Sequence, residues 1–203
     1  MGIESNSNLR SFLARLLAWI GMVVRVLKTM ARRLYDFLIP PRCLACGMMI
    51  PDSHAVCADC WRELDFIVKP WCSRCGEPFA YEPAGVADGV ELLCATCSGD
   101  ATPRFDRLRA VLAYNDGSRA LILPFKHSDH TETARLFAKW LVAFGAEALV
   151  GVDCIAPVPL HRFRLWHRRY NQSALIAWEV GKITGIRVIP DLIERRRATA
   201  SQG

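Results

Sequence analysis

Eight of the nine cysteines in this chain form four Cys-x-x-Cys pairs between residues 43 and 97. A Cys-x-x-Cys turn directs two thiolate sulfurs toward one point, and two such turns supply the four sulfurs of a closed structural Zn²⁺ site. The sequence therefore predicts two structural zinc ions. The eight predicted ligands are Cys43, Cys46, Cys57, Cys60, Cys72, Cys75, Cys94 and Cys97.

Neighbouring pairs are expected to share a metal ion, because they close the shorter loops of chain. The two zinc ribbons would then be built from residues 43–60 and 72–97, with an interleaved pairing as the alternative. Gly47 and Gly76 follow the first knuckle of each ribbon, where a turn around a metal needs a residue that tolerates a positive φ angle. Redox-active dithiols and disulfide frameworks also use such pairs, but four pairs in two quartets favour zinc.

The cysteines and the charge distribution indicate where the protein works and what it contacts. Thiols reserved for metal must stay reduced, which predicts a cytoplasmic protein. Residues 1–42 carry seven Lys/Arg against two Asp/Glu (+5), residues 43–106 four against ten (−6), and residues 107–203 fifteen against eight (+7). Thiolate–zinc sites add further negative charge, so the ribbons are expected to be structural or to bind a protein partner. Single-stranded DNA would contact the basic flanks instead.

Residues 1–39 are predicted to form a basic amphipathic helix. Apolar residues recur at spacings of three and four from Leu9 to Leu38, and basic residues interrupt them. The longest charge-free apolar run, Leu16 to Val24, has nine residues, which is too short to span a bilayer. The helix would dock on this protein or on a partner, or it would lie on a membrane surface as a peripheral attachment.

Residues 103–203 are predicted to form an α/β domain that follows a zinc module over residues 40–102. Alternating residues over 107–114 predict a strand with Leu108, Ala110, Leu112 and Tyr114 on one face. The apolar run 154–160 predicts a buried parallel strand with Cys154 in the core. A third strand is expected over residues 187–189. Helices are expected over residues 61–71, 119–127, 131–149 and 173–184.

The most basic stretch of the chain lies between the second predicted strand and the last predicted helix. Residues 161–170 contain four arginines and two histidines. Ligands of α/β sheets bind at the loops that leave the carboxyl ends of strands, and a following helix N-terminus adds N–H donors for an anion. We therefore expect this loop to bind phosphate or pyrophosphate, the alternative being a solvated basic loop. The candidate residues are His161, Arg162, Arg164, Arg168, Arg169, Asn171 and Gln172.

Several motifs, in this order along the chain, resemble the ComF family. They are the double Cys-x-x-Cys ribbon, Phe105-Asp106, Phe125-Lys126-His127, Pro157-Val158-Pro159-Leu160-His161, Tyr170-Asn171-Gln172 and the segment Arg197 to Gln202. Members of that family are phosphoribosyltransferase-like proteins with an N-terminal double zinc ribbon, associated with competence and DNA uptake in bacteria. The resemblance covers residues 34–203.

The resemblance implies a type I phosphoribosyltransferase fold with a pyrophosphate-binding loop after the strand that contains Pro157 and Pro159. It also implies a mobile loop over the substrate that includes Arg197, Thr199 and Gln202. The implied partners are phosphoribosyl pyrophosphate and DNA-uptake or recombination proteins.

One motif of that family is missing from the 203 residues. It is the Asp-Asp-x-x-Thr-Thr-Gly type of turn, which grips the ribose and 5′-phosphate. We therefore expect an incomplete phosphoribosyltransferase-like domain with a parallel sheet, as in a truncated member, and no phosphoribosyl transfer by this chain alone. The competing hypothesis is a non-enzymatic zinc-ribbon protein that binds a protein partner or nucleic acid.

Overall fold

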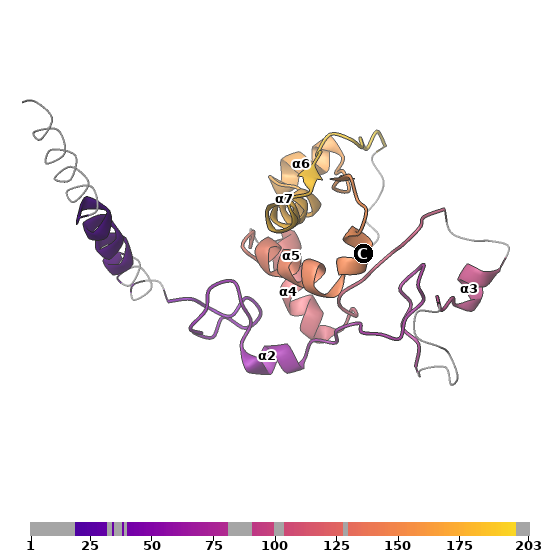
Figure 1. The fold of residues 1–203 in the computed structure, drawn as a ribbon, viewed down its shortest axis with the longest axis horizontal. Coiled ribbons are helices and arrows are strands. Elements are labelled where there is room, and N and C mark those ends of the chain that lie inside the picture. Colours follow the sequence, from indigo (N-terminus) through magenta and orange to yellow (C-terminus); the bar gives the residue numbers. More distant parts are fainter. Residues whose placement is uncertain are drawn as a thin grey trace, which may run out of the picture.

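The computed structural model describes residues 19–31, 34, 38, 40–80, 91–99, 104–127 and 130–197 (Figure 1). A helix covers residues 19–31, so the predicted N-terminal helix is confirmed there, and the rest of its predicted range lies largely outside the described residues. The further elements are α2 (Ala58–Arg62), α3 (Ala95–Ser98), α4 (Asp116–His127), α5 (Thr133–Phe144), the 3-10 helix η1 (Ala146–Leu149), β1 (Cys154–Ile155), α6 (Arg162–Arg168), α7 (Gln172–Thr184) and β2 (Arg187–Val188).

The two ribbons are short turns that each lead to a short helix. An antiparallel bridge between Arg42 and Met49 closes the first turn, and one between Trp71 and Pro78 closes the second. The predicted connecting helix over residues 61–71 is wrong. The helix α2 ends at Arg62, and the chain then runs extended. This extended segment is held by a hydrogen bond in which the Ile67 N–H donates to the Val111 carbonyl, 3.0 Å away.

The main hydrophobic core joins the first ribbon to the helices that follow it. Its buried residues come from the segment after α2, from the segment before α4, and from α4 and α5 themselves. Side chains of the first ribbon pack against it. The buried members are Leu64, Val111, Leu121, Leu136 and Trp140, and the ribbon residues packed on them include Leu44, Ala45 and Val56. The predicted boundary at residues 102 and 103 lies outside the described residues.

Residues 107–114 do not form the predicted strand. Only Leu112 makes an isolated antiparallel bridge, to Phe66. The burial does not follow the alternation, because Val111 is buried and Leu112 packs against the core, while Leu108 and Tyr114 are exposed. Arg109 reaches back to the second ribbon, and Val111 packs in one cluster with residues of α4 and α5.

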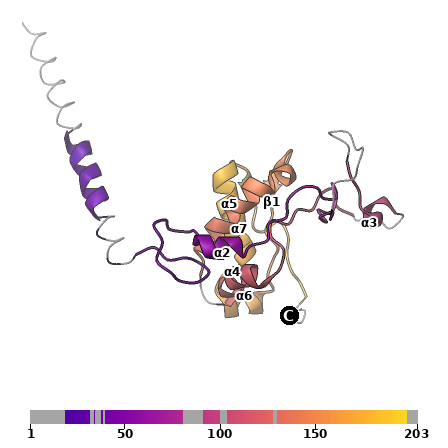
Figure 2. The same ribbon diagram turned by 90° about the horizontal axis from the view of Figure 1, so that it is seen from below.

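Helices α5 and α7 lie side by side, and α7 contacts β2 of the small sheet (Figures 1 and 2). The predicted helix over 131–149 is interrupted at Gly145, whose N–H donates to Leu141 O at 2.9 Å, and η1 follows. Leu136 and Trp140 are buried, so the side of α5 that carries them faces the core. Helix α7 ends at Gly185, in the left-handed conformation with φ of 77°.

The sheet consists of β1 and β2, which pair in parallel with Cys154 opposite Arg187 and Ile155 opposite Val188. The predicted parallel pairing is thus confirmed, but β1 is shorter than the predicted 154–160. Pro157 and Pro159 lack the N–H groups that a longer ladder requires. Cys154 is half-buried rather than in the core. Among the helices in the described ranges, none has the length and apolar character needed for a membrane span.

Candidate metal centres and a basic cleft

The first quartet is held by the turn of the first ribbon and the start of α2. Cys43 and Cys46 flank the turn, which Gly47 completes with φ of 75° and an N–H bond to Cys43 O. Cys57 is the residue before α2, and its backbone N–H donates to Cys43 Sγ at 3.2 Å. Cys60 lies one helical turn further on, which brings all four sulfur atoms within 4.8 Å of one another.

The second quartet repeats this geometry. Gly76 closes its turn with φ of 73°, and Cys94 precedes α3 as Cys57 precedes α2. The Cys94 N–H donates to Cys72 Sγ at 3.4 Å. Cys75 and Cys97 complete a group of sulfurs that again lie within 4.8 Å of one another. The chain therefore carries two copies of one metal-binding unit, grouped in sequential rather than interleaved order.

The sulfur positions fit zinc. The Sγ atoms of Cys46 and Cys57 are 3.7 Å apart, and those of Cys75 and Cys94 are 3.6 Å apart. A tetrahedron with metal–sulfur bonds of about 2.3 Å has edges of about 3.8 Å, whereas a disulfide would bring two sulfurs to about 2.05 Å. The prediction of two structural zinc ions is confirmed, and the described cysteines are all free thiols in place of a disulfide framework.

Backbone hydrogen bonds stabilise the thiolate form of one cysteine in each quartet. Burial alone would raise the pKa of Cys43, but N–H groups including those of Cys46 and Cys57 lower that pKa to about 6. In the second quartet, burial likewise raises the pKa of Cys72 and backbone N–H groups lower it, and the result is again a pKa of about 6. Burial and the neighbouring thiols raise the pKa of Cys97 to about 12. A metal cation is what allows all four thiolates to ionise together.

The second ribbon is attached to the rest of the protein by a buried arginine. The side chain of Arg109 is 6% exposed, and its guanidinium donates to Ser73 O at 2.9 Å and to Glu147 Oε2 at 3.2 Å. The same guanidinium lies 5.5 Å from the centre of the Trp71 ring. Beside it, Leu108 N donates to Arg74 O at 2.7 Å. These contacts fix the turn of the second quartet against the segment that precedes α4.

A basic cleft of about 580 Å³ opens where β1 and β2 end. Parallel strands bring their carboxyl ends to the same edge of a sheet, and ligands of α/β proteins bind at that edge. The segment after β1 contributes His161 and Arg162, the start of α7 contributes Asn171, and the segment after β2 contributes Asp191 and Arg196. The Nδ1 atom of His161 is buried and has no hydrogen-bond partner within the described protein.

Of the predicted anion-site residues, His161, Arg162 and Asn171 line this cleft. The basic stretch is not the predicted loop, because residues 162–168 form α6 and Arg169 ends it with φ of 65°. Arg164, Arg168, Arg169, Gln172 and Arg197 are not among the lining residues. Thr199 and Gln202 lie outside the described residues.

Two of the predicted polar residues have structural partners. The side chain of Asn171 accepts hydrogen bonds from Ser173 N and Ala174 N, which caps α7, and donates to Val158 O. Gln172 is buried, and its amide donates to Lys126 O at 3.1 Å, which connects α7 to the end of α4. Asn171 therefore lines the cleft as a fixed group, while Gln172 holds the helix in place.

Sequence reasoning missed the contribution of the segment after β2. Asp191, Glu194, Arg195 and Arg196 line the cleft together with the residues after β1. The available signal was the expected parallel pairing of the two strands, because it places both following segments at one edge. The cleft thus contains acidic as well as basic groups.

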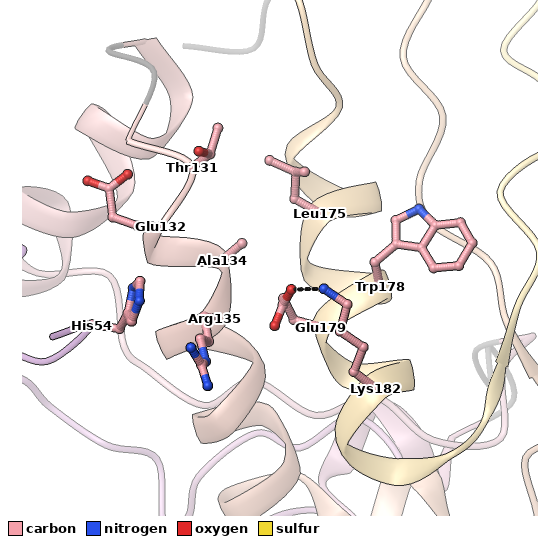
Figure 3. Close-up of a pocket in the computed structure, with 9 residues that line it drawn as sticks. All are labelled: His54, Thr131, Glu132, Ala134, Arg135, Leu175, Trp178, Glu179 and Lys182. Carbon is pink, nitrogen blue, oxygen red and sulfur yellow. Dashed lines mark hydrogen bonds and ion pairs between the residues drawn. The ribbon is translucent and has the colours of Figure 1, made fainter. Parts of the chain in front are cut away.

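A second hollow, of about 790 Å³, lies between α5 and α7 beside the first ribbon (Figure 3). Thr131, Glu132 and Arg135 line the α5 side, and Leu175, Glu179 and Lys182 line the α7 side, where the last two form an ion pair. His54 reaches it from the first ribbon, with φ of 59° and a buried Nδ1 atom that lacks a partner within the described protein. Two carboxylates balance Arg135 and Lys182 in this hollow, whereas three arginines face two carboxylates in the cleft.

Comparison with known proteins supports the assignment of the ribbons. The family described as the double zinc ribbon domain matches residues 34–98. The chain is 30% identical over 170 residues to the DNA utilization protein YhgH of Salmonella typhimurium, covering 81% of this chain and 70% of that protein. It is 25% identical over 167 residues to competence protein F of Haemophilus influenzae, covering 79% and 68%. No solved structure matches the chain.

Two cysteine quartets in repeated ribbons, joined to helices and a small parallel sheet, define a double zinc ribbon protein with an α/β segment. The similarity to YhgH and to competence protein F extends through both parts. The chain belongs to the ComF family.

Proposed function

We propose that this protein takes part in the handling of DNA, as the name of its relative YhgH describes, and that its basic cleft binds the diphosphate of phosphoribosyl pyrophosphate. The observation that carries the proposal is the position of the cleft at the carboxyl edge of β1 and β2. His161, Arg162 and Arg196 supply donors there. An anionic phosphate oxygen would give the buried Nδ1 atom of His161 the partner it lacks.

The phosphoribosyltransferase-like fold remains part of this proposal. A parallel β1–β2 pair with the helices α6 and α7 between the strands is compatible with it. The proposal assigns binding rather than group transfer to the cleft, because a fold does not by itself establish chemistry. The helix of residues 1–39, the ribbons of 40–102 and the α/β part of 103–203 are proposed as its three parts. The eight reduced thiols support a cytoplasmic location.

Calorimetric titration with pyrophosphate and with phosphoribosyl pyrophosphate tests the cleft. Arg162→Ala and Arg196→Ala should each weaken binding by roughly tenfold or more, because each removes charge-assisted hydrogen bonds. Arg119→Ala is the matched control, since Arg119 lies on the exposed face of α4 and outside the cleft. Zinc content should stay at two ions in all three variants. Equal affinities for the variants and the unchanged protein would refute the proposed site.

A second candidate function rests on α6. Phe163 is 68% exposed and Trp166 is 82% exposed, and both lie among the arginines of the basic segment. A spacing of three residues places the two rings on one side of the helix. Exposed rings interleaved with cations are typical of surfaces on which the bases of single-stranded DNA stack. The non-enzymatic hypothesis would use this surface, with the zinc ribbons as a structural support.

The two functions separate experimentally. Trp166→Ala should weaken binding of a fluorescent single-stranded oligonucleotide by about 1–3 kcal/mol and leave the pyrophosphate titration unchanged. Arg196→Ala should weaken pyrophosphate binding. The affinity for the oligonucleotide should fall steeply as the salt concentration rises, because phosphate contacts release counterions. If the affinity for the oligonucleotide changes neither with salt concentration nor in Trp166→Ala, α6 is excluded as the DNA-binding surface.

A further inference from the structure

The helix over residues 19–31 exposes nearly all of its apolar side chains. It extends away from the remaining elements in both views (Figures 1 and 2). Soluble proteins rarely leave so continuous an apolar surface uncovered unless it binds something. The exposed large side chains are Trp19, Ile20, Met22, Val24, Val26, Leu27 and Met30.

The polar residues of this helix lie on one narrow side. Gly21, Arg25 and Lys28 are separated by four and three residues, so they share a face, and Thr29 adjoins it. The Thr29 hydroxyl donates to Arg25 O at 2.9 Å, which satisfies that hydroxyl within the helix. The remaining circumference is apolar. A wide apolar face, which includes Trp19, opposite a narrow cationic face is the arrangement of helices that lie in the plane of a membrane surface.

Charge identifies the kind of surface. The described part of the helix contains two cations and no acidic residue, and residues 1–42 as a whole carry seven Lys/Arg against two Asp/Glu. Anionic phospholipid headgroups attract such a segment, whereas zwitterionic headgroups do not. A second copy of the helix would place like charges near one another. We propose that residues 19–31 attach the protein to an anionic lipid surface, with the apolar face in the acyl boundary and Arg25 and Lys28 at the headgroups.

Vesicle co-sedimentation of the full chain tests this attachment. We expect binding to vesicles of phosphatidylcholine with phosphatidylglycerol and at least tenfold weaker binding to phosphatidylcholine alone. Leu27→Asp should abolish binding by placing a charge in the apolar face. Arg25→Glu combined with Lys28→Glu should abolish the preference for phosphatidylglycerol. Arg119→Glu with Lys126→Glu on α4 makes the same change in net charge elsewhere and should preserve binding.

Two further measurements test whether the helix binds lipid rather than a second copy of the chain. The emission of Trp19 should shift to the blue on vesicle binding, and Trp19→Phe should remove that shift. Analytical ultracentrifugation without lipid should give the same oligomeric state for the unchanged protein and Leu27→Asp. The proposal is overturned if binding is equal on both kinds of vesicle or absent from both, or if Leu27→Asp converts a dimer to a monomer. Zinc content of two ions verifies that each variant is folded.

Discussion

The guanidinium of Arg109 lies 3.2 Å from the carboxylate of Glu147, and the arginine side chain is almost fully buried while the glutamate is 42% exposed. Lys69 approaches the other carboxylate oxygen of Glu147 at 2.6 Å. The core cluster formed by the described residues includes side chains of the first ribbon and none from residues 72–97. The second ribbon is therefore held by polar contacts around Arg109, whereas the first ribbon is held by the hydrophobic core.

Replacing Arg109 should loosen the second ribbon. Arg109→Ala removes the donors to Ser73 O and Leu108 O and leaves two carbonyls without these partners, so we expect the free energy of unfolding to fall by about 2 kcal/mol. Urea titration measures the loss. Arg119→Ala removes an exposed ion pair on α4 and should cost less than about 1 kcal/mol. Equal losses in both variants would mean that Arg109 does not hold the ribbon.

The contribution of Glu147 should depend on pH. Its pKa is lowered from the ordinary value, first by the hydrogen bond from Lys69 and then by that from Arg109, against the opposing effect of burial. Because the folded pKa lies below the unfolded one, the ion pair stabilises the protein above the ordinary carboxyl pKa of about 4.3 and loses this effect as the pH falls.

The measurement is the stability difference between the unchanged protein and Glu147→Gln. Acid also protonates zinc thiolates, but both proteins carry the same sites, so the comparison isolates Glu147. We expect the difference to be constant from pH 7 to about pH 5 and to shrink below about pH 4.3. A difference that grew toward acid pH would contradict the lowered pKa.

The two zinc sites should differ in what their loss does to the rest of the chain. Cys57→Ser and Cys94→Ser change equivalent positions, each at the start of a short helix. Each variant should retain one zinc ion by elemental analysis. Cys57→Ser should also reduce protection of α4 and α5 from amide exchange, since Leu44 and Val56 pack on their core. Cys94→Ser should leave that protection nearly unchanged. A larger loss of protection in Cys94→Ser than in Cys57→Ser would contradict this prediction.

The sequence predicted the sites that depend on local spacing. Four Cys-x-x-Cys pairs fixed the metal ligands, and Gly47 and Gly76 marked the turns, because knuckle geometry extends over only a few residues. The extended segment before α4 was predicted as a strand, but its packing depends on Arg109 reaching Ser73, 36 residues earlier in the chain. Alternation alone carries no information on such a long-range contact. The part of the cleft that follows β2 was also missed, although the expected parallel pairing places the segments after both strands at one edge of the sheet.

The close approach of α7 to β2 gives a test of the strand pairing that positions the cleft. A Cβ atom on Gly181 would lie 2.5 Å from Val188 Cγ2 and 3.0 Å from Ile186 O. Val188 is β-branched and pairs with Ile155, so its side chain cannot turn away easily. We expect Gly181→Ala to lower the free energy of unfolding by about 1–3 kcal/mol, more than the helix propensity of alanine restores.

Gly21→Ala is the matched control, because Gly21 is also helical and a Cβ atom added there would meet nothing within 4 Å. That variant should be as stable as the unchanged protein or slightly more stable. Displacement of β2 should also move Asp191 and Arg196, so Gly181→Ala should weaken pyrophosphate binding while Gly21→Ala leaves it unchanged. Urea titration and calorimetry on the same samples measure both effects. If Gly181→Ala behaves like Gly21→Ala in both, α7 does not hold β2 in close contact.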